Sequence, residues 1–316
     1  MTGPLVSVVI AVRDSERFIE SSVRSALAQT YSPLEIVVVD DGSRDRTGEI
    51  LERMRDPRMR VLRTAGIGSA RAKNLGMRET TGRYLAFLDA DDLWERNKVA
   101  THVKVMESSR FDVTFSRSRL IDEHGANLPL PIRRVRGVYD FESLLRDNVI
   151  GNGSAVVARR SAIPPGGFDE TRTACVDYDL WLRIAHTRSG NVFCIPEVLT
   201  VYRRHAGQLS GDWRRMQVGW DSLMVKMREL APEVVARSEP MARANWCRYL
   251  AFLAYEHGEP GQAFRLLRQS FKASPRAAAL NLRTWLLAGA IAAGAVMPSV
   301  VRPLGYAFGS VSRKVL

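Results

Sequence analysis

Apolar runs alternate with amphipathic segments over the first half of this sequence. Residues 5–12, 35–40 and 84–88 are nearly continuous apolar runs, many of them β-branched. Such runs are typical of strands that are buried on both faces of a parallel sheet. Between the first two runs, residues 16–29 place their apolar side chains on one helical stripe. The alternation predicts an α/β fold.

The same patterns predict the remaining elements. Further helices are expected over 45–54, 70–79, 96–109, 140–146 and 177–186, and further strands over 60–62, 112–118, 155–158 and 198–203. Ser69 is the expected N-cap of the helix over 70–79. Residues 122–138 lose the periodicity and carry Gly125, Pro129 and Pro131, which predicts a loop.

From about residue 211 onward the pattern is helical throughout. Residues 246–257 and 260–273 predict an αα-hairpin that turns at Gly258 and Glu259. The chain therefore divides into an α/β domain over residues 1–210 and a helical C-terminal region over residues 211–316.

Composition places the chain among globular proteins, with 46% hydrophobic and 25% charged residues. Its three cysteines are too few and too scattered for a disulfide framework, and no CxxC pair indicates zinc. Residues 1–4 lack the basic start of a secretory signal, so we expect a cytosolic protein.

The net charge of +12 is concentrated toward the C-terminus. No acidic residue follows Glu259, and eight basic residues do: Arg265, Arg268, Lys272, Arg276, Arg283, Arg302, Arg313 and Lys314. They surround an apolar stretch of about 17 residues over 285–301, which favours an anionic membrane surface over nucleic acid. The stretch predicts an interfacial helix with a basic rim, or else a helix packed within the C-terminal region.

Polar clusters follow three of the predicted strands. Arg13 and Asp14 come after the first, Asp40 and Asp41 after the second, and residues 89–92 (DADD) after the fourth. Ligands of open α/β sheets bind outside the carboxyl ends of strands. Carboxylates gathered there repel one another, and a divalent cation bridging a diphosphate would offset that repulsion.

Three segments carry a resemblance to a known family. They are VSVVIAVRDSERFIESSVRSALAQTYSPLEIVVVDDGSRDRT at 6–47, GIGSARAKNLGMRETTGRYLAFLDADDLW at 66–94 and GGFDETRTACVDYDLWLRIA at 166–185. In order and spacing they resemble glycosyltransferase family 2, over about residues 5 to 210. The resemblance implies the GT-A fold, a Rossmann-like, mostly parallel sheet flanked by helices. Residues 1–120 would then bind the nucleotide and residues 121–210 the acceptor.

The resemblance also implies roles for individual residues. The nucleotide pocket would be lined by Ala11, Arg13, Glu16, Asp40, Asp41 and Arg71. Asp89 and Asp91 match the family's DxD motif, with Asp91 as the direct metal ligand and Asp89 nearer the ribose or also on the metal. His205 falls where some relatives place a histidine beside the metal. The cation would be Mn²⁺ or Mg²⁺, and the donor a nucleotide-diphosphate sugar, with UDP favoured.

Asp177 matches the aspartate that serves as general base in the family's inverting members. A hydroxyl acceptor is a poor nucleophile, so a positioned carboxylate must take its proton. At the start of a helix the dipole would lower the pKa of Asp177. The alternative is that Asp177 only caps this helix. Asp179, two residues on, is expected to be structural.

Some positions depart from the family pattern or admit another interpretation. The family's proline is Ala11 here, its Tyr-Asn pair is Arg13-Asp14, and the glutamate before the base is Val176. Arg71 could be a solvated helix residue, and His205 a histidine with no ligand role.

The predicted function is inverting sugar transfer to a glycan, a lipid-linked acceptor or a small hydroxyl compound. We expect it at the cytosolic membrane face, in polysaccharide or glycolipid synthesis. One alternative is a sugar nucleotidyltransferase, although residues 1–15 lack the Gly-rich loop that would cradle a triphosphate. The other is a catalytically degenerate module that binds at the membrane through its helical tail.

Overall fold

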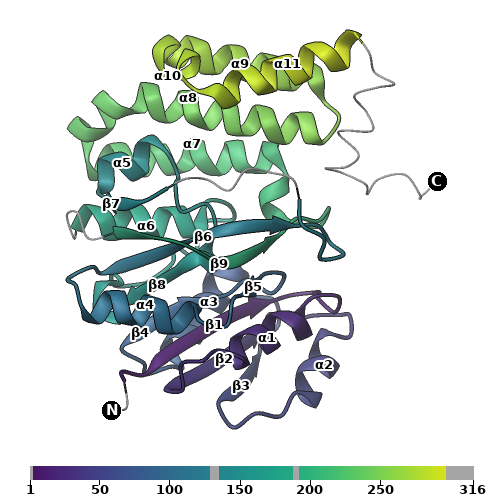
Figure 1. The fold of residues 1–316 in the computed structure, drawn as a ribbon, viewed down its shortest axis with the longest axis vertical. Coiled ribbons are helices and arrows are strands. Elements are labelled where there is room, and N and C mark those ends of the chain that lie inside the picture. Colours follow the sequence, from purple (N-terminus) through teal and green to yellow (C-terminus); the bar gives the residue numbers. More distant parts are fainter. Residues whose placement is uncertain (1–2, 129–134, 188–191, 297–316) are drawn as a thin grey trace. The chain divides into compact units, whose positions relative to one another are not determined.

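The computed structural model describes residues 3–128, 135–187 and 192–296 (Figure 1). The chain forms two compact units. The first comprises Met1–Phe141 and Val149–Arg203, and the second comprises Glu142–Asn148 and Arg204–Leu316. A short internal segment therefore belongs with the C-terminal helices.

The first unit is built on one sheet of nine strands within the described residues, in the order β3-β2-β1-β4-β8-β6-β9-β5, with β7 added on β9. The strands are β1 (Val6–Val12), β2 (Leu34–Asp40), β3 (Met59–Arg63), β4 (Tyr84–Phe87), β5 (Leu93–Trp94), β6 (Val113–Ile121), β7 (Gly137–Tyr139), β8 (Val156–Arg159) and β9 (Val192–Arg203).

Strand directions confirm the predicted, mostly parallel α/β sheet. The strands β3, β2, β1 and β4 are mutually parallel, and β6 is parallel to β9. The strand β8 runs antiparallel to both β4 and β6, so it separates the two parallel parts. In the β1–β2 pair, Val12 lies opposite Asp40. The segments that follow β1 and β2 therefore leave the sheet at the same edge.

Helices cover both faces of this sheet (Figure 1). They are α1 (Ile19–Leu27), α2 (Thr47–Arg53), α3 (Ser69–Arg78), α4 (Lys98–Glu107) and α6 (Val176–Thr187). The N-cap of α3 is Gly68 with φ +94°, so the predicted cap at Ser69 is wrong by one residue. The Gly68 N–H donates a hydrogen bond to the Asp41 carboxylate at 2.8 Å, and this contact turns the chain sharply just before the helix. The positive φ that the turn requires is easily adopted only by glycine.

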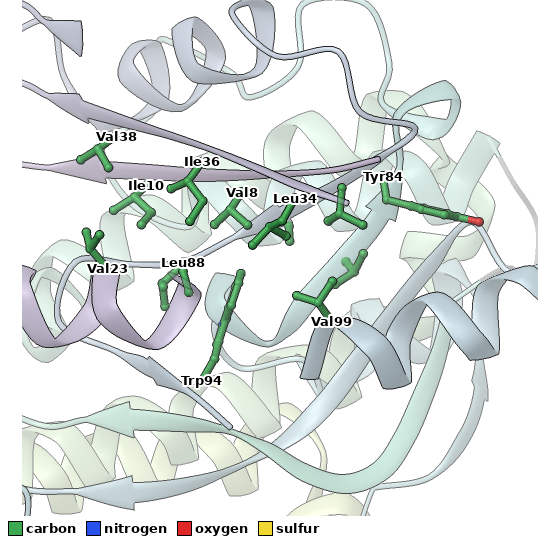
Figure 2. Packing of buried hydrophobic residues seen from close by; sticks show 14 of the residues in the cluster. Val8, Ile10, Val23, Leu34, Ile36, Val38, Tyr84, Leu88, Trp94 and Val99 are labelled. Carbon is green, nitrogen blue, oxygen red and sulfur yellow. The ribbon is translucent and has the colours of Figure 1, made fainter. Parts of the chain in front are cut away.

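The core follows from the two-sided apolar strands. Val8, Ile10 and Ile36 lie with Val23 of α1 on one face of the sheet (Figure 2). Val37 and Val39 point to the other face and pack with Ala72 of α3. Each fully buried aliphatic side chain of this kind contributes about 1.5–3 kcal/mol. The strand ends are thus held by a core on both sides.

The second unit is helical. It contains α7 (Trp213–Leu230), α8 (Pro232–Glu256), α9 (Pro260–Ala273), α10 (Pro275–Ala279) and α11 (Leu282–Val296), and most of α5 (Phe141–Arg146). The predicted αα-hairpin is confirmed as α8 and α9, which turn at Gly258 with φ +74°. Residues 297–301 of the predicted apolar stretch lie outside the described residues. Over the described part of the chain, none of the helices combines the length and apolar character that a membrane span requires.

Glu142 ties α5 to α8 within the second unit. Its carboxylate accepts hydrogen bonds from Arg237 Nε at 2.9 Å and from Ser238 Oγ at 2.8 Å. These two hydrogen bonds, and then the charge of Arg146, lower the pKa of Glu142 to about 2. The side chain is 23% exposed, so solvent weakens the interaction.

We expect Glu142→Gln to lower the free energy of unfolding by about 1–2 kcal/mol at pH 7. The folded-state pKa lies below the unfolded value of about 4.3, so the stabilisation is present above that pH. It is lost as the pH falls toward 2, where the native carboxyl protonates. Urea denaturation of both proteins between pH 7 and pH 3 measures the difference.

The exposed Glu229 on α7 supplies a matched control. Glu229→Gln should change stability by less than about 0.5 kcal/mol at either pH. A loss in Glu142→Gln that stays constant as the pH falls would contradict the ionic origin of the effect.

Candidate active site

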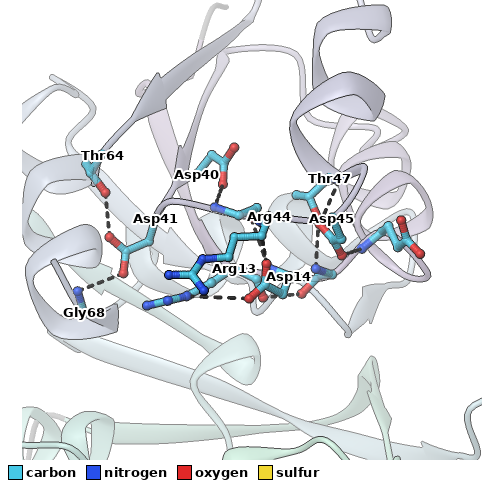
Figure 3. Close-up of polar contacts among 12 residues, drawn as sticks. Arg13, Asp14, Asp40, Asp41, Arg44, Asp45, Thr47, Thr64 and Gly68 are labelled. Atoms are coloured by element: carbon cyan, nitrogen blue, oxygen red, sulfur yellow. Dashed lines mark hydrogen bonds and ion pairs between the residues drawn. The ribbon is translucent and has the colours of Figure 1, made fainter. Parts of the chain in front are cut away.

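The three polar clusters that follow predicted strands lie at the ends of adjacent strands, since β2, β1 and β4 are neighbours in the sheet. The Leu88 N–H donates to the Val9 carbonyl, which brings the start of the DADD segment alongside β1. Figure 3 shows the segments after β1 and β2 facing one another. The structure therefore brings these groups to one edge of the sheet.

The Asp41 carboxylate shapes the turn before α3. It accepts hydrogen bonds from Ile67 N at 2.6 Å, Gly68 N at 2.8 Å and Thr64 Oγ1 at 2.5 Å (Figure 3). Its neighbour Asp40 accepts from Ser43 N at 3.0 Å. Both aspartates are 4% exposed. Their contacts organise the loops, and their predicted contact with a nucleotide stays a prediction.

The loop after β1 is held against the loop after β2. Asp14 adopts φ +49° and accepts a hydrogen bond from Arg44 N at 2.7 Å (Figure 3). The Arg13 side chain is 49% exposed and lies 3.7 Å from Asp14. A Cβ on Gly66 would come within 3.3 Å of Arg13 Nη1, so the guanidinium reaches the same loop as Asp41.

Two other predicted pocket residues have structural contacts. Glu16 accepts a hydrogen bond from Arg46 N at 3.0 Å and donates its own N–H to Asp45 Oδ2 at 2.9 Å. Ala11 is half-buried near the end of β1, beside Val39. Both lie at the predicted edge of the sheet.

Asp92 anchors the DADD segment from inside the protein. It is fully buried and accepts hydrogen bonds from Ser154 Oγ at 2.5 Å and Arg203 N at 2.9 Å. Burial, followed by the charges of Asp91 and Asp89, raises the pKa of Asp92 well above its usual value. Asp92 thus fixes the segment, while Asp89 and Asp91 remain partly exposed.

The backbone of the segment is held from three other elements. Ser154, in the 3₁₀ turn Gly153–Ala155, accepts the Asp89 N–H at 3.0 Å. Ser22 of α1 donates to the Asp89 carbonyl at 3.1 Å, and Arg203 of β9 donates to the Asp91 carbonyl at 2.8 Å. Such support is what a site with fixed carboxylate positions needs.

Asp177 and Asp89 meet through Lys73, which the sequence did not single out. The Lys73 ammonium lies 2.9 Å from Asp177 Oδ1 and 3.2 Å from Asp89 Oδ1. It also sits 5.5 Å from the centre of the Phe168 ring. Although burial opposes it, the charges of Asp177 and Asp89 raise the pKa of Lys73.

Asp177 is the second residue of α6, so it is not the cap of that helix. Burial raises the pKa of its carboxyl, and the charge of Lys73 offsets only part of this effect. The prediction that the helix dipole would lower this pKa is therefore wrong, because desolvation outweighs it. A raised pKa suits a general base better than a lowered one.

Cys175, at the N-terminal end of α6, adopts φ +55°, which is uncommon for a residue other than glycine. Its thiol is buried, which raises its pKa to about 12. A thiol with a raised pKa is a poor nucleophile at neutral pH. Asp179 is fully buried and pairs with Arg183 at 2.7 Å.

Arg71 and His205 lie away from this carboxylate pair or outside its unit. Arg71 is 57% exposed, and its Nε lies 3.3 Å from Glu170 Oε2. His205 belongs to the second unit. Their predicted roles at the nucleotide and at the metal stay predictions.

The sequence does carry a local signal for Lys73 and Asn74. Both lie on the buried side of α3 with Ala70 and Met77, at helical spacing, whereas Arg71 points outward. A lysine on the apolar stripe of a helix needs a buried partner. Asn74 donates to the Phe168 carbonyl at 2.9 Å and accepts the Phe168 N–H at 2.9 Å.

The chemistry of Asp89 and Asp91 is suited to a divalent cation that a bound ligand would also coordinate. Across the described ranges, no group of three or more His, Cys, Asp or Glu side chains is arranged to hold a metal. Mg²⁺ usually takes only one or two carboxylates and completes its shell with substrate phosphates and water. Asp89 and Asp91, two partly exposed carboxylates on one short segment, meet that description, and their binding of a metal stays a prediction.

We expect Ser154→Ala to lower the free energy of unfolding by about 1–3 kcal/mol, because it removes a hydrogen bond from the buried Asp92 carboxyl. Denaturant unfolding measures the loss. The exposed Ser108 at the end of α4 is the control, and Ser108→Ala should change stability by less than about 0.5 kcal/mol. Equal effects of the two substitutions would contradict the anchoring role of Asp92.

Comparison with known proteins identifies the family. The family model described as Glycosyl transferase family 2 matches residues 7–164. The UDP-Glc:alpha-D-GlcNAc-diphosphoundecaprenol beta-1,3-glucosyltransferase WfaP of Escherichia coli is 32% identical over 219 residues, 66% of this chain and 80% of that enzyme.

Solved structures agree on the fold. S. aureus TarS 1-349 in complex with UDP-GlcNAc matches with TM-score 0.63 at 16% identity, over 96% of this chain and 90% of that chain. The mannosyltransferase PcManGT from Pyrobaculum calidifontis, in complex with GDP-Man and Mn2+, matches with TM-score 0.60 at 22% identity, over 96% of this chain and 84% of that chain. The predicted GT-A fold is confirmed, and the chain is a glycosyltransferase that belongs to glycosyltransferase family 2.

Proposed function

We propose that this glycosyltransferase moves a sugar from a nucleotide-diphosphate donor to a hydroxyl acceptor with inversion at the anomeric carbon. The observation that carries the proposal is the pair formed by Asp89 and Asp177, whose Oδ1 atoms share the Lys73 ammonium at 3.2 and 2.9 Å. Asp89 follows β4, in the part of the chain that would bind the nucleotide, and Asp177 lies in the first turn of α6, in the part that would bind the acceptor. Donor and acceptor would meet between them.

The donor is a UDP-sugar in this proposal. The TarS structure is described in complex with UDP-GlcNAc, and the PcManGT structure in complex with GDP-Man and Mn2+. Both ligands are nucleotide sugars, which supports a nucleotide sugar as the donor here. Asp40, Asp41 and Arg13 lie at the sheet edge where such ligands bind. With Ala11, Glu16 and Arg71 they would form the nucleotide pocket.

The acceptor is a lipid-linked sugar. The name of the WfaP enzyme states an acceptor in which a sugar diphosphate is joined to undecaprenol. The similarity over 80% of that enzyme supports a related acceptor here, in the synthesis of a cell-envelope glycan. The reaction would take place at the cytosolic face of the membrane.

Asp177 acts as the general base. Its carboxylate accepts the proton of the acceptor hydroxyl while the hydroxyl oxygen bonds to the anomeric carbon. The bond from that carbon to the diphosphate breaks, and its electron pair leaves with the diphosphate. Attack from the face opposite the leaving group inverts the configuration.

Asp91 and Asp89 would hold Mn²⁺ or Mg²⁺ against the departing diphosphate, with His205 as a further candidate ligand. When bound, the cation neutralises negative charge that develops on the leaving group. Asp92 contributes by fixing the segment that carries both aspartates, through its hydrogen bonds to Ser154 and Arg203.

A screen of purified protein against UDP-, GDP- and dTDP-sugars with Mn²⁺ and a lipid-linked acceptor tests this function. We expect nucleotide release with a UDP-sugar, and a product whose anomeric configuration, read by NMR, is opposite to that of the donor. Asp91→Ala should abolish both turnover and Mn²⁺-dependent UDP binding. Asp177→Asn should keep UDP binding and lower kcat by about 10²–10⁴-fold.

The exposed Asp221, on α7 of the second unit, provides the control variant Asp221→Asn, which should retain turnover. Near-native kcat in Asp177→Asn would refute its role as base. UDP binding without any transfer would favour the catalytically degenerate module. Pyrophosphate release from UTP and a sugar phosphate would favour the nucleotidyltransferase.

The second unit supplies the membrane contact in this proposal. On α11, Leu282, Trp285 and Leu286 are 70%, 54% and 64% exposed, while Leu287 and Ile291 on the opposite side are buried. Trp285 also touches Phe271 of α9, with ring centroids 5.8 Å apart. An exposed apolar surface of this kind can insert at the interfacial region of a bilayer when basic side chains accompany it.

Basic side chains accompany this apolar face. Exposed on α9 and α10 are Arg265, Arg268, Lys272 and Arg276. Each basic residue near an anionic surface contributes about 1 kcal/mol. Apolar area and positive charge together favour an anionic membrane.

We therefore expect the protein to co-sediment with vesicles that contain phosphatidylglycerol and to remain in solution with pure phosphatidylcholine vesicles. A variant with Leu282→Ser, Trp285→Ser and Leu286→Ser should lose most of this binding. Each large apolar side chain that is no longer buried in the bilayer removes about 1.5–3 kcal/mol from the free energy of binding. Val225→Ser on α7, where the side chain is 54% exposed, is the control. Unchanged sedimentation of the triple variant, or dimerisation through this face, would contradict the membrane contact.

A further inference from the structure

Lys73 is a buried cation placed between the two carboxylates on which the proposed reaction depends. Its side chain is 9% exposed. Its ammonium donates a hydrogen bond to Asp177 Oδ1 at 2.9 Å and forms an ion pair with Asp89 Oδ1 at 3.2 Å. The Phe168 ring, 5.5 Å away, faces the same ammonium. The contacts of the Lys73 ammonium named here are therefore all with groups of the site itself.

The two oxygens of Asp177 have different surroundings. Oδ1 accepts the hydrogen bond from Lys73. Oδ2 faces Gly153, where an added Cβ would come within 2.9 Å of it. No hydrogen bond to Oδ2 comes from the described parts of the chain. The contact with Lys73 thus fixes which oxygen is turned toward the space left by the glycine.

The helix that carries Lys73 is held on both sides. A Cβ on Gly76 would come within 2.5 Å of Val9 Cγ1, so α3 approaches β1 as closely as a glycine allows. Asn74 fastens the same helix to the Phe168 backbone with two hydrogen bonds of 2.9 Å. Lys73 therefore reaches the carboxylates from a helix in a fixed position.

We propose that Lys73 is a positioning residue for the transfer reaction, and that Asp177 Oδ2 is the atom that receives the proton of the acceptor. Lys73 keeps its own protons and holds Asp177 Oδ1 and Asp89 Oδ1 at one ammonium. This fixes the base relative to the aspartate beside the donor, so that Oδ2 meets the acceptor hydroxyl next to Gly153. The inference rests on the proposed inverting transfer with Asp177 as base.

Three variants test the proposal: Lys73→Met, Lys73→Arg and the control Lys104→Met, which changes an exposed lysine of α4. Lys73→Met should lower kcat by about 10²-fold, since a misplacement of about 1 Å has that effect. Its affinity for UDP with Mn²⁺, measured by calorimetry, should stay within about threefold or become tighter, because a positive charge beside Asp89 is removed. Lys73→Arg keeps the charge and should recover part of kcat, and Lys104→Met should match the wild type.

A double-variant cycle separates positioning from a structural role. If Lys73 acts through Asp177, Lys73→Met should lower kcat by less than about threefold in the Asp177→Asn background. A structural defect would instead lower kcat by similar factors in both backgrounds. Circular dichroism melting of each variant establishes that it is folded. Should Lys73→Met not fold, Lys73→Arg with and without Asp177→Asn completes the same cycle.

Several results would overturn the proposal. They are a kcat within about threefold of wild type in Lys73→Met, a loss of UDP affinity equal to the loss of kcat, and independent effects in the cycle. A loss of UDP affinity would make Lys73 a donor ligand instead. Absence of transfer by the wild type is a separate outcome, which refutes the proposed function and this inference with it.

Discussion

The site depends on how one edge of the sheet offsets the mutual repulsion of several carboxylates. The acids are compensated in three ways. Asp41 receives backbone N–H groups, Asp92 is buried with a raised pKa, and Asp89 and Asp177 share one lysine. Of the three aspartates on the DADD segment, Asp89 and Asp91 are partly exposed, whereas Asp92 is buried. The mode of compensation therefore separates the acids that build the site from those available to a ligand.

Much of the fold could be predicted because strands buried on both faces leave a clear apolar pattern. The runs at β1, β2 and β4 were located to within a residue or two, as were the turn of the hairpin and the helix α9, whereas α8 begins at Pro232, well before the predicted start at residue 246. The short strand β5 was missed because two residues carry no periodicity. The N-cap of α3 was misplaced because Asp41, distant in sequence, sets the turn at Gly68.

The site was predictable in its residue types and less so in its contacts. The motifs located Asp89, Asp91 and Asp177, yet sequence alone does not distinguish Asp92, which is buried, from Asp91 beside it. The pKa of Asp177 was predicted in the wrong direction because its desolvation depends on residues of other elements. The apolar stripe of α3 indicates that Lys73 has a buried partner, but it does not say which one, because the contact with Asp177 spans 104 positions.

The helix α3 links the two halves of the proposed reaction. Its start is set by Asp41, whose carboxylate holds the Ile67 and Gly68 N–H groups at the edge where a nucleotide would bind. Its buried side carries Lys73, which contacts the candidate base, and Asn74, which holds the backbone that leads to α6. The loop that Asp41 organises and the candidate base Asp177 therefore both contact α3, a single helix of ten residues. One rigid element thus fixes the position of Lys73 relative to the edge where a nucleotide would bind.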